Sequence, residues 1–409
     1  MTLGLSKKDK TIKGEIFLNS SKSISNRLLI IRALCEDAFE IENLSEAQDT
    51  QTLLALLEKY KNQKVLDAGA AGTTFRFLTA FLAFQKGTQV LTGSERMKQR
   101  PIGVLVDALR SLGAEINYLE KEGYPPIELK EGKQNGKHEL SIPAHISSQF
   151  ISALLLIAPS LENGLNIQLQ GKIISKPYLI MTLELMKDHG INYSFNGNVI
   201  KLAAQKYQGK AQSVEADWSA ASYFYSLACL AEKVDLKLHG LHEKSIQGDS
   251  QICKIMESFG VLSEFNKSTL NISKTKNADL KRFTYDFEAC PDIAQTMSVI
   301  CAGKGIYAEL KGLSTLKIKE TDRIEALKKE LAKFKVAVNT DDDSLVQMGK
   351  SIVNGQLIKT YEDHRMAMAF APLALGSGLV IEDPDVVNKS YPNFWKDLEI
   401  LGFKLFYKK

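Results

Sequence analysis

Residues 108–118, A-L-R-S-L-G-A-E-I-N-Y, and residues 398–407, L-E-I-L-G-F-K-L-F-Y, share one pattern: a helical stretch, a glycine and a short strand. The pattern recurs at residues 184–195, E-L-M-K-D-H-G-I-N-Y-S-F, and at residues 255–265, I-M-E-S-F-G-V-L-S-E-F. Glycine adopts the left-handed conformation that ends many helices without steric cost. Each stretch therefore predicts a helix that ends at a glycine cap, with a strand directly after it.

The pattern is spaced regularly along the chain. Residues 329–338, K-E-L-A-K-F-K-V-A-V, form a further copy with Lys335 in place of glycine, and residues 55–65, A-L-L-E-K-Y-K-N-Q-K-V, form a degenerate one. Successive cap residues lie 77, 70, 75 and 67 positions apart: Gly113, Gly190, Gly260, Lys335 and Gly402. Six α/β units, divided as three and three, predict an α/β fold with two similar domains. Helix–glycine–strand junctions also occur in unrelated α/β proteins, so a chance repeat is the alternative.

Composition excludes several classes of protein. The chain has 409 residues, 44% hydrophobic and 24% charged, and a net charge of +4 that is too small to predict a nucleic-acid partner. Five cysteines without a C-x-x-C pair argue against a disulfide framework or a zinc site. The start lacks the apolar core of a signal peptide, and no apolar run is long enough to span a bilayer. We expect a soluble, cytoplasmic protein with a domain boundary near residues 214–217.

Five short runs place cationic side chains where helices are predicted to begin. Lys and Arg destabilise a helix start, because the unpaired N–H groups and the helix dipole favour anions there. Their repeated placement indicates that these positions bind strong anions such as phosphate or carboxylate. The runs are S-K-S-I-S-N-R with Lys22, G-S-E-R-M-K-Q-R-P with Arg96 and Arg100, K-E-T-D-R with Lys319 and Arg323, E-D-H-R-M-A-M with His364 and Arg365, and V-N-K-S-Y-P with Lys389.

Two polar runs mark further candidate sites. In G-A-A-G-T-T-F-R, Gly72 would let a ligand approach the backbone closely, although a tight turn is the more common explanation. Ser147, Ser148 and Gln149, with Ser175 downstream, could cradle a phosphate at a helix start. Helix capping explains these serines about equally well, with Ser148 as the expected cap.

Two carboxylates are candidates for proton transfer. Glu320 lies between the cations of K-E-T-D-R, which would keep it ionised until it gains a proton. The alternative is a surface ion pair between Glu320 and Arg323, worth about 0.3 kcal/mol. Asp292, in A-C-P-D-I-A-Q-T, is a second carboxylate at a predicted helix start, where a lone Asp is usually a cap.

Together and in this order, the motifs resemble those of the 5-enolpyruvylshikimate-3-phosphate synthase family of enolpyruvyl transferases. The resemblance covers essentially the whole chain, from S-K-S-I-S-N-R through A-G-T, R-M-K-x-R-P-I-G, S-S-Q-F, S-K-P-Y, K-E-T-D-R and D-H-R-M-A-M to K-S-Y-P. It implies transfer of the enolpyruvyl group of phosphoenolpyruvate to the 5-hydroxyl of shikimate 3-phosphate, with release of phosphate. This reaction belongs to the shikimate pathway of aromatic amino acid biosynthesis.

The resemblance also implies an architecture. Each of two domains should contain three βαβαββ units, an inside-out α/β barrel type of fold, with the active site in an interdomain cleft. The N-terminal domain should span residues 20–215, and the C-terminal domain residues 1–19 and 216–409, because the first strand crosses over. The implied partners are the two small-molecule substrates, without nucleic acid or membrane. No metal or organic cofactor is implied, and we expect a monomer.

The resemblance assigns roles to individual residues. Asp292 is the implied base near the 5-hydroxyl, and Glu320 is the implied acid and base at the methylene carbon, with Lys22 as a third catalytic residue. The implied ligands of shikimate 3-phosphate are Lys22, Ser23, Arg27, Ser147, Ser148, Gln149, Ser175, Asp292, Thr315 and Lys319. The implied ligands of phosphoenolpyruvate are Lys22, Gly72, Arg96, Gln149, Arg323, Arg365 and Lys389.

Three positions depart from the family pattern. Ala70 stands where the family usually has Asn, and Thr315 where an Asn is common. Both lie near implied substrate sites, so they put substrate affinity in doubt more than reaction type. Phe77 stands where Pro often follows the Arg, and it could shift the helix that carries it.

Two alternatives differ in function. The enolpyruvyl transferase that acts on UDP-N-acetylglucosamine shares the fold and the donor, but typically carries a reactive Cys on the loop before R-P, where residues 93–100 contain none. That enzyme also lacks S-S-Q-F and K-E-T-D-R. A non-catalytic relative could bind anionic metabolites without turnover. Glu320, Asp292 and Lys22 argue against it, because binding alone needs no proton-transfer carboxylates.

Because Gly72 is retained, we expect glyphosate to inhibit the chain in competition with phosphoenolpyruvate. Initial rates at several concentrations of both compounds would test this. Activity that persists unchanged at millimolar glyphosate would contradict the expectation.

Overall fold

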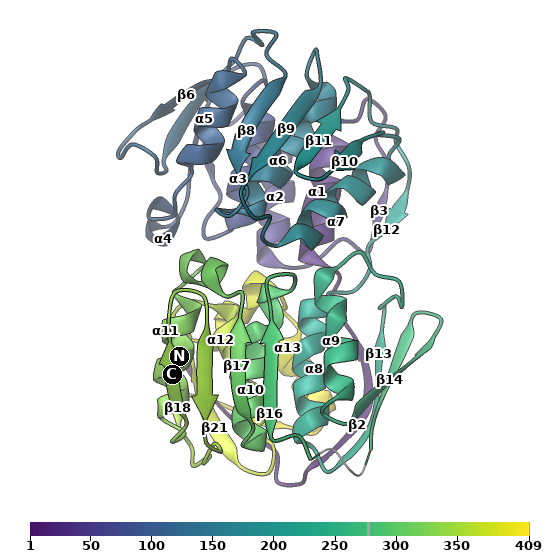
Figure 1. Cartoon of the computed structure of the whole chain (residues 1–409), viewed down its shortest axis with the longest axis vertical. Coiled ribbons are helices and arrows are strands. Elements are labelled where there is room, and N and C mark those ends of the chain that lie inside the picture. Colours follow the sequence, from purple (N-terminus) through teal and green to yellow (C-terminus); the bar gives the residue numbers. More distant parts are fainter. Residues whose placement is uncertain (276–278, 409) are drawn as a thin grey trace. The chain divides into compact units, whose positions relative to one another are not determined.

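The computed structural model describes residues 1–275 and 279–408. The chain forms two compact units, each considered by itself. We call Ser21–Val214 the N-terminal unit, and Met1–Ser20 with Glu215–Lys409 the C-terminal unit. Figure 1 shows that both are built from helices and short strands. In the described part of the chain, no helix is long and apolar enough to cross a membrane.

The C-terminal unit repeats one sheet topology, with strand orders β14-β15-β13-β2, β16-β17-β19-β18 and β20-β21-β1-β22 among its described residues. In each sheet the first two strands of the repeat pair in parallel, as β2 and β13 do, and the others pair antiparallel. The first repeat contains β2 (Thr11–Phe17), α8 (Trp218–Leu230), β13 (Lys233–His239), α9 (Ile252–Glu257), β14 (Val261–Asn266) and β15 (Thr269–Lys274). The second contains β16 (Arg282–Asp286), α10 (Ala294–Lys304), β17 (Tyr307–Lys311), α11 (Arg323–Ala332), β18 (Ala337–Thr340) and β19 (Leu345–Met348). The third contains β20 (Leu357–Ile358), α12 (His364–Phe370), β21 (Gly378–Glu382), α13 (Phe394–Ile400), β22 (Lys404–Lys408) and β1 (Thr2–Ser6).

The N-terminal unit has two complete repeats with the same topology, ordered β4-β5-β7-β6 and β10-β11-β9-β8. The predicted α/β fold with repeated βαβαββ units is confirmed. One repeat contains β4 (Val65–Asp67), α3 (Gly72–Leu82), β5 (Thr88–Thr92), α4 (Glu95–Lys98), α5 (Gly103–Ser111), β6 (Glu115–Tyr118) and β7 (Ile127–Lys130). The other contains β8 (Glu139–Pro143), α6 (Ser148–Ile157), β9 (Leu165–Gln170), α7 (Lys176–Asp188), β10 (Ser194–Asn196) and β11 (Val199–Leu202).

The predicted degenerate copy belongs to a reduced repeat. It consists of α1 (Lys22–Leu34), β3 (Ile41–Glu42), α2 (Gln48–Lys59) and β12 (Gln212–Ser213), whose two strands pair in parallel. After α2 the chain enters β4, the first strand of the next repeat, so the usual hairpin does not follow. Short 3₁₀ helices complete the structure: η1 (Ala158–Ser160), η2 (Gly248–Gln251), η3 (Pro291–Ile293), η4 (Ser314–Ile318), η5 (Ala371–Ala374) and η6 (Pro384–Lys389).

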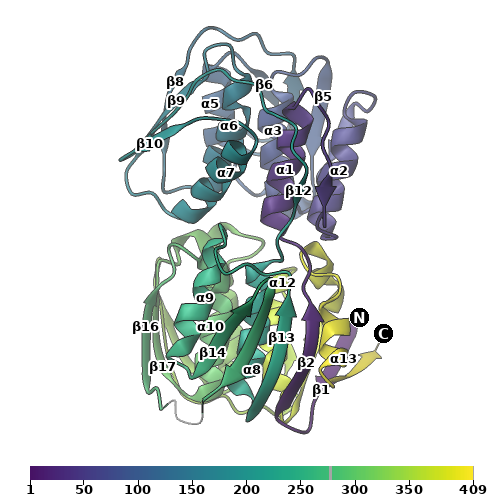
Figure 2. The same ribbon diagram turned by 90° about the vertical axis from the view of Figure 1, so that its right-hand side faces the viewer.

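Two strands belong to a different unit from the helix that follows them in the chain. Strand β2 pairs with β13 of the C-terminal unit, as Figure 2 shows, although the chain continues from β2 into α1. Strand β12 pairs with β3 of the N-terminal unit, although the chain continues into α8. The terminal strands β1 and β22 pair with each other in the C-terminal unit.

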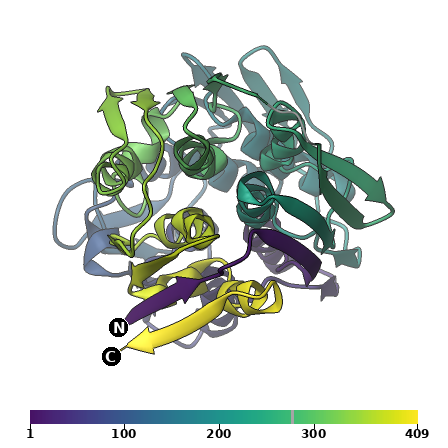
Figure 3. The ribbon, with the colours of Figure 1, turned by 90° about the horizontal axis from the view of Figure 1, so that it is seen from below.

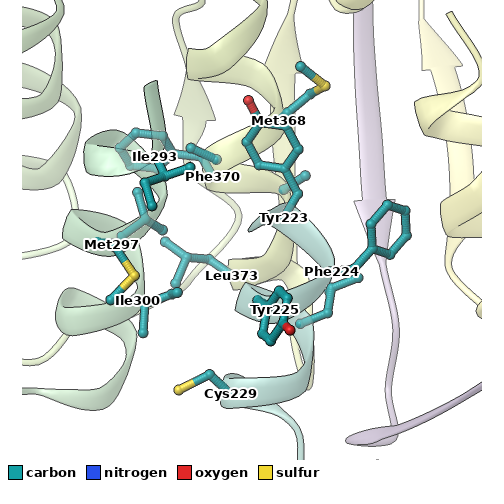
Figure 4. Close-up of a cluster of buried hydrophobic side chains, with 14 of the residues drawn as sticks. Tyr223, Phe224, Tyr225, Cys229, Ile293, Met297, Ile300, Met368, Phe370 and Leu373 are labelled. Carbon is teal, nitrogen blue, oxygen red and sulfur yellow. The ribbon is translucent and has the colours of Figure 1, made fainter. Parts of the chain in front are cut away.

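The core of the C-terminal unit is made by helices, with sheets outside them. Helices α8, α10 and α12 contact one another, and nearly all of their residues are buried. Viewed end on, these helices lie inside the surrounding strands (Figure 3). A helix buried on all sides needs apolar residues around its circumference, which explains the run W-S-A-A-S-Y-F-Y-S-L-A-C-L. Figure 4 shows Tyr223, Phe224 and Tyr225 of α8 near Met297 of α10 and Phe370 of α12.

The predicted left-handed caps are confirmed at all five spaced positions. The φ angles are 103° at Gly113, 85° at Gly190, 74° at Gly260, 65° at Lys335 and 87° at Gly402. A residue with a Cβ pays about 1–2 kcal/mol in this conformation, so Lys335 adopts the backbone of its glycine counterparts at a steric cost.

Substituting Lys335→Gly should therefore stabilise the C-terminal unit by about 0.5 kcal/mol, after the greater flexibility of glycine in the unfolded chain is deducted. The matched change is Gly402→Ala, which should destabilise the unit by about 1 kcal/mol or more, because the new Cβ would lie 3.0 Å from Lys7 Nζ. Urea unfolding would measure both. A loss of stability in Lys335→Gly would contradict the cap assignment.

Candidate active site

In the C-terminal unit, helix starts converge on one group of cations and acids. Arg323, the first residue of α11, is 2% exposed and donates to three carboxylates. Its Nε lies 2.7 Å from Asp363 Oδ2, Nη1 lies 3.0 Å from Asp292 Oδ1, and Nη2 lies 2.8 Å from Glu320 Oε2. Asp363 caps α12, and Asp292 lies in η3 just before α10. The starts of three helices therefore lie at the same end of this unit.

Asp292 is the centre of this group. Arg365 Nη2 donates to its Oδ2 at 2.8 Å, and Lys319 Nζ lies 3.9 Å from its Oδ1. Together with Arg323, these residues surround one carboxylate with three cations. Such an arrangement gives the Asp292 carboxylate a fixed orientation.

Arg365, the second residue of α12, joins this group to α8. Its Nη1 donates to the Tyr223 hydroxyl at 3.3 Å and to the backbone oxygen of Asp292 at 3.2 Å. Its Nη2 donates to Ser219 Oγ at 3.3 Å. Tyr223 is a member of the buried cluster in Figure 4. The hydrogen bond to Tyr223 therefore connects Arg365 to the hydrophobic core.

Burial and charge act in opposite directions on the cations. Burial tends to lower the pKa of Arg323, but Asp363, Glu320 and Asp292 together raise it above its ordinary value. For Lys319 burial prevails over Asp292, and the pKa of the ammonium is lowered. Burial raises the pKa of Tyr223 to about 12, against the opposing effect of Arg365.

Of two further predicted site residues in this unit, Lys389 lies differently from expectation, and for Thr315 no position in an element was predicted. Lys389 was expected at a helix start, but it is the last residue of η6, because that segment forms a 3₁₀ turn before α13. Its Nζ donates to the backbone oxygen of Glu362 at 2.7 Å. Thr315 lies in η4, and its hydroxyl oxygen is buried without a hydrogen-bond partner among the described residues.

The N-terminal unit also gathers its helix starts at one end. Lys22, the first residue of α1, donates to Asp49 Oδ2 at 2.8 Å, in the first turn of α2. The Thr74 hydroxyl of α3 donates to the backbone oxygen of Asp49 at 2.8 Å, and Gln149 Nε2 of α6 donates to the Thr73 hydroxyl at 3.2 Å. The first turns of four helices are thus linked.

Arg27, in the second turn of α1, is 3% exposed. It donates to the Thr182 hydroxyl at 2.7 Å, the backbone oxygen of Ser23 at 2.8 Å and the backbone oxygen of Tyr178 at 3.3 Å. These acceptors are neutral, and burial lowers the pKa of Arg27 to about 10, at which the group stays charged near neutral pH. A buried cation without a carboxylate among these partners favours a nearby anion.

Phe77, one of the three departures, supports this cation. Its side chain is buried, and the guanidinium carbon of Arg27 lies 5.5 Å from the ring centroid. The geometry is that of a cation–π contact. Phe77 therefore contributes to the surroundings of Arg27, which is predicted to bind shikimate 3-phosphate.

The serines occupy helix starts as expected, with one correction. Ser147, not Ser148, caps α6, and its hydroxyl accepts from Gln149 N at 3.3 Å. Ser148 is the first helical residue, because Ser147 has the extended backbone that a cap requires. Ser175 precedes α7 with φ 54° and ψ 36°, a left-handed conformation that is costly for serine.

The Gly72 and Arg96 runs lie next to each other. A Cβ on Gly72, the first residue of α3, would lie 2.6 Å from Arg100 Nη1, so glycine makes room for that guanidinium. Arg96 lies in the one-turn helix α4 and is half-buried. Pro101 follows Arg100 directly and precedes Ile102, the cap of α5.

Sequence reasoning missed acids that pair with the predicted cations. Asp49 pairs with Lys22, and Asp363, which also caps α12, pairs with Arg323. Asp49 follows A-Q in the first turn of α2, and an acid at a predicted helix start was the signal that could have identified it. Among the described residues, no group of three or more His, Cys, Asp or Glu side chains could hold a metal ion.

Comparisons with known proteins agree in one family. The sequence profile of the family described as "EPSP synthase (3-phosphoshikimate 1-carboxyvinyltransferase)" matches residues 6–62 and 58–398. A protein of Bacteroides fragilis named 3-phosphoshikimate 1-carboxyvinyltransferase is 45% identical over 397 residues, which are 96% of each chain. One of the same name from a Sulfurovum species is 36% identical, over 96% of this chain and 97% of its own.

A solved structure agrees in fold. The EPSP synthase of Acinetobacter baumannii superposes with a TM-score of 0.79 over 99% of this chain and 100% of its own. The two sequences are 20% identical, so this likeness concerns the fold alone.

Removing the carboxylate of Asp363 should cost more than an ordinary helix cap. Asp363→Ala would leave the buried Arg323 without its shortest partner, and we expect a loss of about 3–5 kcal/mol in the free energy of unfolding. Asp322→Ala is the matched control, because Asp322 caps α11 and forms no ion pair with another described residue, so about 1 kcal/mol is expected. Equal losses in urea unfolding would show that Arg323 does not depend on Asp363.

Proposed function

The chain belongs to the EPSP synthase (3-phosphoshikimate 1-carboxyvinyltransferase) family, and we infer that it transfers the enolpyruvyl group of phosphoenolpyruvate to the 5-hydroxyl of shikimate 3-phosphate, releasing phosphate. The observation that carries this inference is the match to the family over nearly the whole chain. The reaction places the chain in the shikimate pathway of aromatic amino acid biosynthesis.

The cations suit the charges of these substrates. Each substrate carries one phosphate and one carboxylate, so bringing the pair together requires neutralisation of four anionic groups. Helix starts supply N–H groups and a positive dipole end, and Lys and Arg supply full charges. Phosphate neutralised in this way is a good leaving group, and the proposal therefore includes no metal or organic cofactor.

We assign shikimate 3-phosphate chiefly to serines and cations at helix starts. Ser147, Ser148 and Ser175 would hold the 3-phosphate, because they stand at the starts of α6 and α7, where helix N–H groups and the helix dipole favour anions. The buried charge of Arg27 supports this position for an anion. The other proposed ligands are Lys22, Ser23, Gln149, Asp292, Thr315 and Lys319.

We assign phosphoenolpyruvate mainly to arginines. The planar guanidinium groups of Arg323 and Arg365 match carboxylate and phosphate oxygens, and Asp292 already orients both. The half-buried Arg96 lies on a separate short helix. The other proposed ligands are Lys22, Gly72, Gln149 and Lys389.

Proton transfers complete the proposed mechanism. Asp292 accepts the proton of the 5-hydroxyl as the oxygen bonds to the central carbon of the enolpyruvyl group, and the methylene carbon gains a proton from Glu320. Glu320 then removes a proton from the new methyl group as the bond to phosphate breaks, and the proton that Asp292 took from the hydroxyl passes to the released phosphate. Before addition Glu320 must be protonated, and its contact with Arg323 means that substrate binding has to change this pairing. Lys22, fixed by Asp49, offsets charge during both steps.

The proposed reaction predicts that the chain releases phosphate from phosphoenolpyruvate only when shikimate 3-phosphate is present. We also propose that the chain acts as a monomer, so activity per chain should not change with protein concentration. Because the proposal includes no metal, activity should not change with EDTA either. Folded protein that binds both compounds without releasing phosphate would favour the non-catalytic alternative.

Substituting Glu320→Gln should lower kcat by about 100-fold or more while substrate binding changes little, because the amide cannot exchange the proton. Glu325→Gln is the matched control on α11, the helix that follows Glu320, since Glu325 pairs with Lys329 at the exposed surface. Steady-state kinetics would measure both. An unchanged kcat in Glu320→Gln would remove this residue from the mechanism.

A further inference from the structure

Asp249, in η2, is a buried carboxyl group to which no step above assigns a role. Its residue is 4% exposed, and Oδ2 accepts a short hydrogen bond from the Ser219 hydroxyl of α8. Oδ1 is buried and has no hydrogen-bond partner among the described residues. An ionised carboxylate with one unpaired buried oxygen is costly, so the neutral form is favoured in this position.

A short path joins Asp249 to Arg365. Ser219 Oγ, which contacts Asp249, also accepts from Arg365 Nη2 at 3.3 Å. The same Nη2 donates to Asp292 Oδ2 at 2.8 Å. One nitrogen of Arg365 is therefore shared between Asp292 and a hydroxyl that Asp249 holds in place.

The surroundings of Asp249 set its ionisation near neutral pH. Burial raises its pKa to about 7, with a further increase from Asp292 and a smaller one from Asp217, while Arg365 opposes them. Cys290 is a further titratable neighbour, and burial keeps its pKa above the ordinary value, so the thiol is uncharged. Asp217 belongs to the start of α8, Asp292 and Cys290 to η3 and its cap, and Arg365 to α12.

We propose that Asp249 is a positioning residue that controls, through Ser219, how strongly Arg365 is held within the C-terminal unit and thus how available Arg365 is to an anionic substrate. Neutral Asp249 fixes the Ser219 hydroxyl without adding charge. Ionised Asp249 places a second carboxylate beside Arg365 and competes with the substrate for its positive charge. The proposal rests on the assignment of Arg365 to phosphoenolpyruvate.

The test compares wild type with Asp249→Asn, which mimics the neutral acid. The KM for phosphoenolpyruvate is measured by phosphate release from about pH 6 to pH 9, at saturating shikimate 3-phosphate. The ratio of wild-type KM to variant KM cancels the ionisation of the substrate itself. We expect this ratio to be near one at pH 6 and to rise roughly five- to tenfold by pH 8.5, with less change in the kcat ratio.

Two controls separate this effect from a structural one. Asp235→Asn, at an exposed Asp of the same unit, should give a ratio that does not change with pH. Ser219→Ala removes the link, so its KM should change less with pH than that of wild type. A KM ratio for Asp249→Asn that is constant across pH would overturn the proposal. If Asp249→Asn does not fold, a Ser219→Ala profile parallel to wild type would do the same.

Thermal unfolding gives a readout independent of activity. The folded pKa of Asp249 is raised, so the wild type should lose stability as the pH rises from about 4, where the unfolded chain ionises, to about 7. The Tm of Asp249→Asn relative to wild type should increase over that range and then level off. A constant difference would overturn the proposal. Absence of phosphate release by folded wild type would instead refute the proposed function, while this Tm comparison could still be made.

Discussion

Cationic side chains at helix N-termini, each held by a nearby carboxylate, are the interaction on which the structure of both units depends. A helix start that carries Lys or Arg is unfavourable alone, because its dipole repels positive charge. The pairs Lys22–Asp49 and Arg323–Asp363 offset this cost inside their own units. An anionic substrate can add to such a pair or take the place of the acid, so the acids keep the cations ordered before substrate arrives.

The repeated topology explains why helix starts collect at one end of each unit. In every complete repeat the first helix lies between two parallel strands, so it begins at the carboxyl end of the first. Three such repeats in the C-terminal unit bring the starts of α8, α10 and α12 together (Figure 1). The second helix α11 adds Arg323 at the same end. The fold thus provides several positive helix ends, and the sequence adds Lys and Arg side chains at them.

Local signals predicted much of this architecture. The spacing of Gly113, Gly190 and Gly402 located helix ends and strands, and even the exception at Lys335 adopts the glycine conformation. What the sequence could not give were contacts between residues far apart in the chain. Asp49 lies 27 residues from Lys22, and Asp363 lies 40 residues from Arg323.

Sequence patterns also did not predict the local structure of several short segments. The hydroxyls of Ser147 and Ser148 are both suitable helix caps. Ser147 is the cap in the structure because its backbone is extended. The segment that ends at Lys389 forms a 3₁₀ turn, which has no strong sequence signature. Strand β2 pairs with β13 and strand β12 pairs with β3, and in both cases the two strands are far apart in the sequence. The periodicity of the sequence does not predict such pairings.

A crystal structure with bound shikimate 3-phosphate would test the central claim most directly, because it shows where the phosphate lies relative to the helix starts. The account predicts phosphoryl oxygens within about 3 Å of the hydroxyls of Ser147, Ser148 and Ser175. A phosphate bound away from these helix starts, with the Lys22 and Arg323 pairs unchanged, would contradict it.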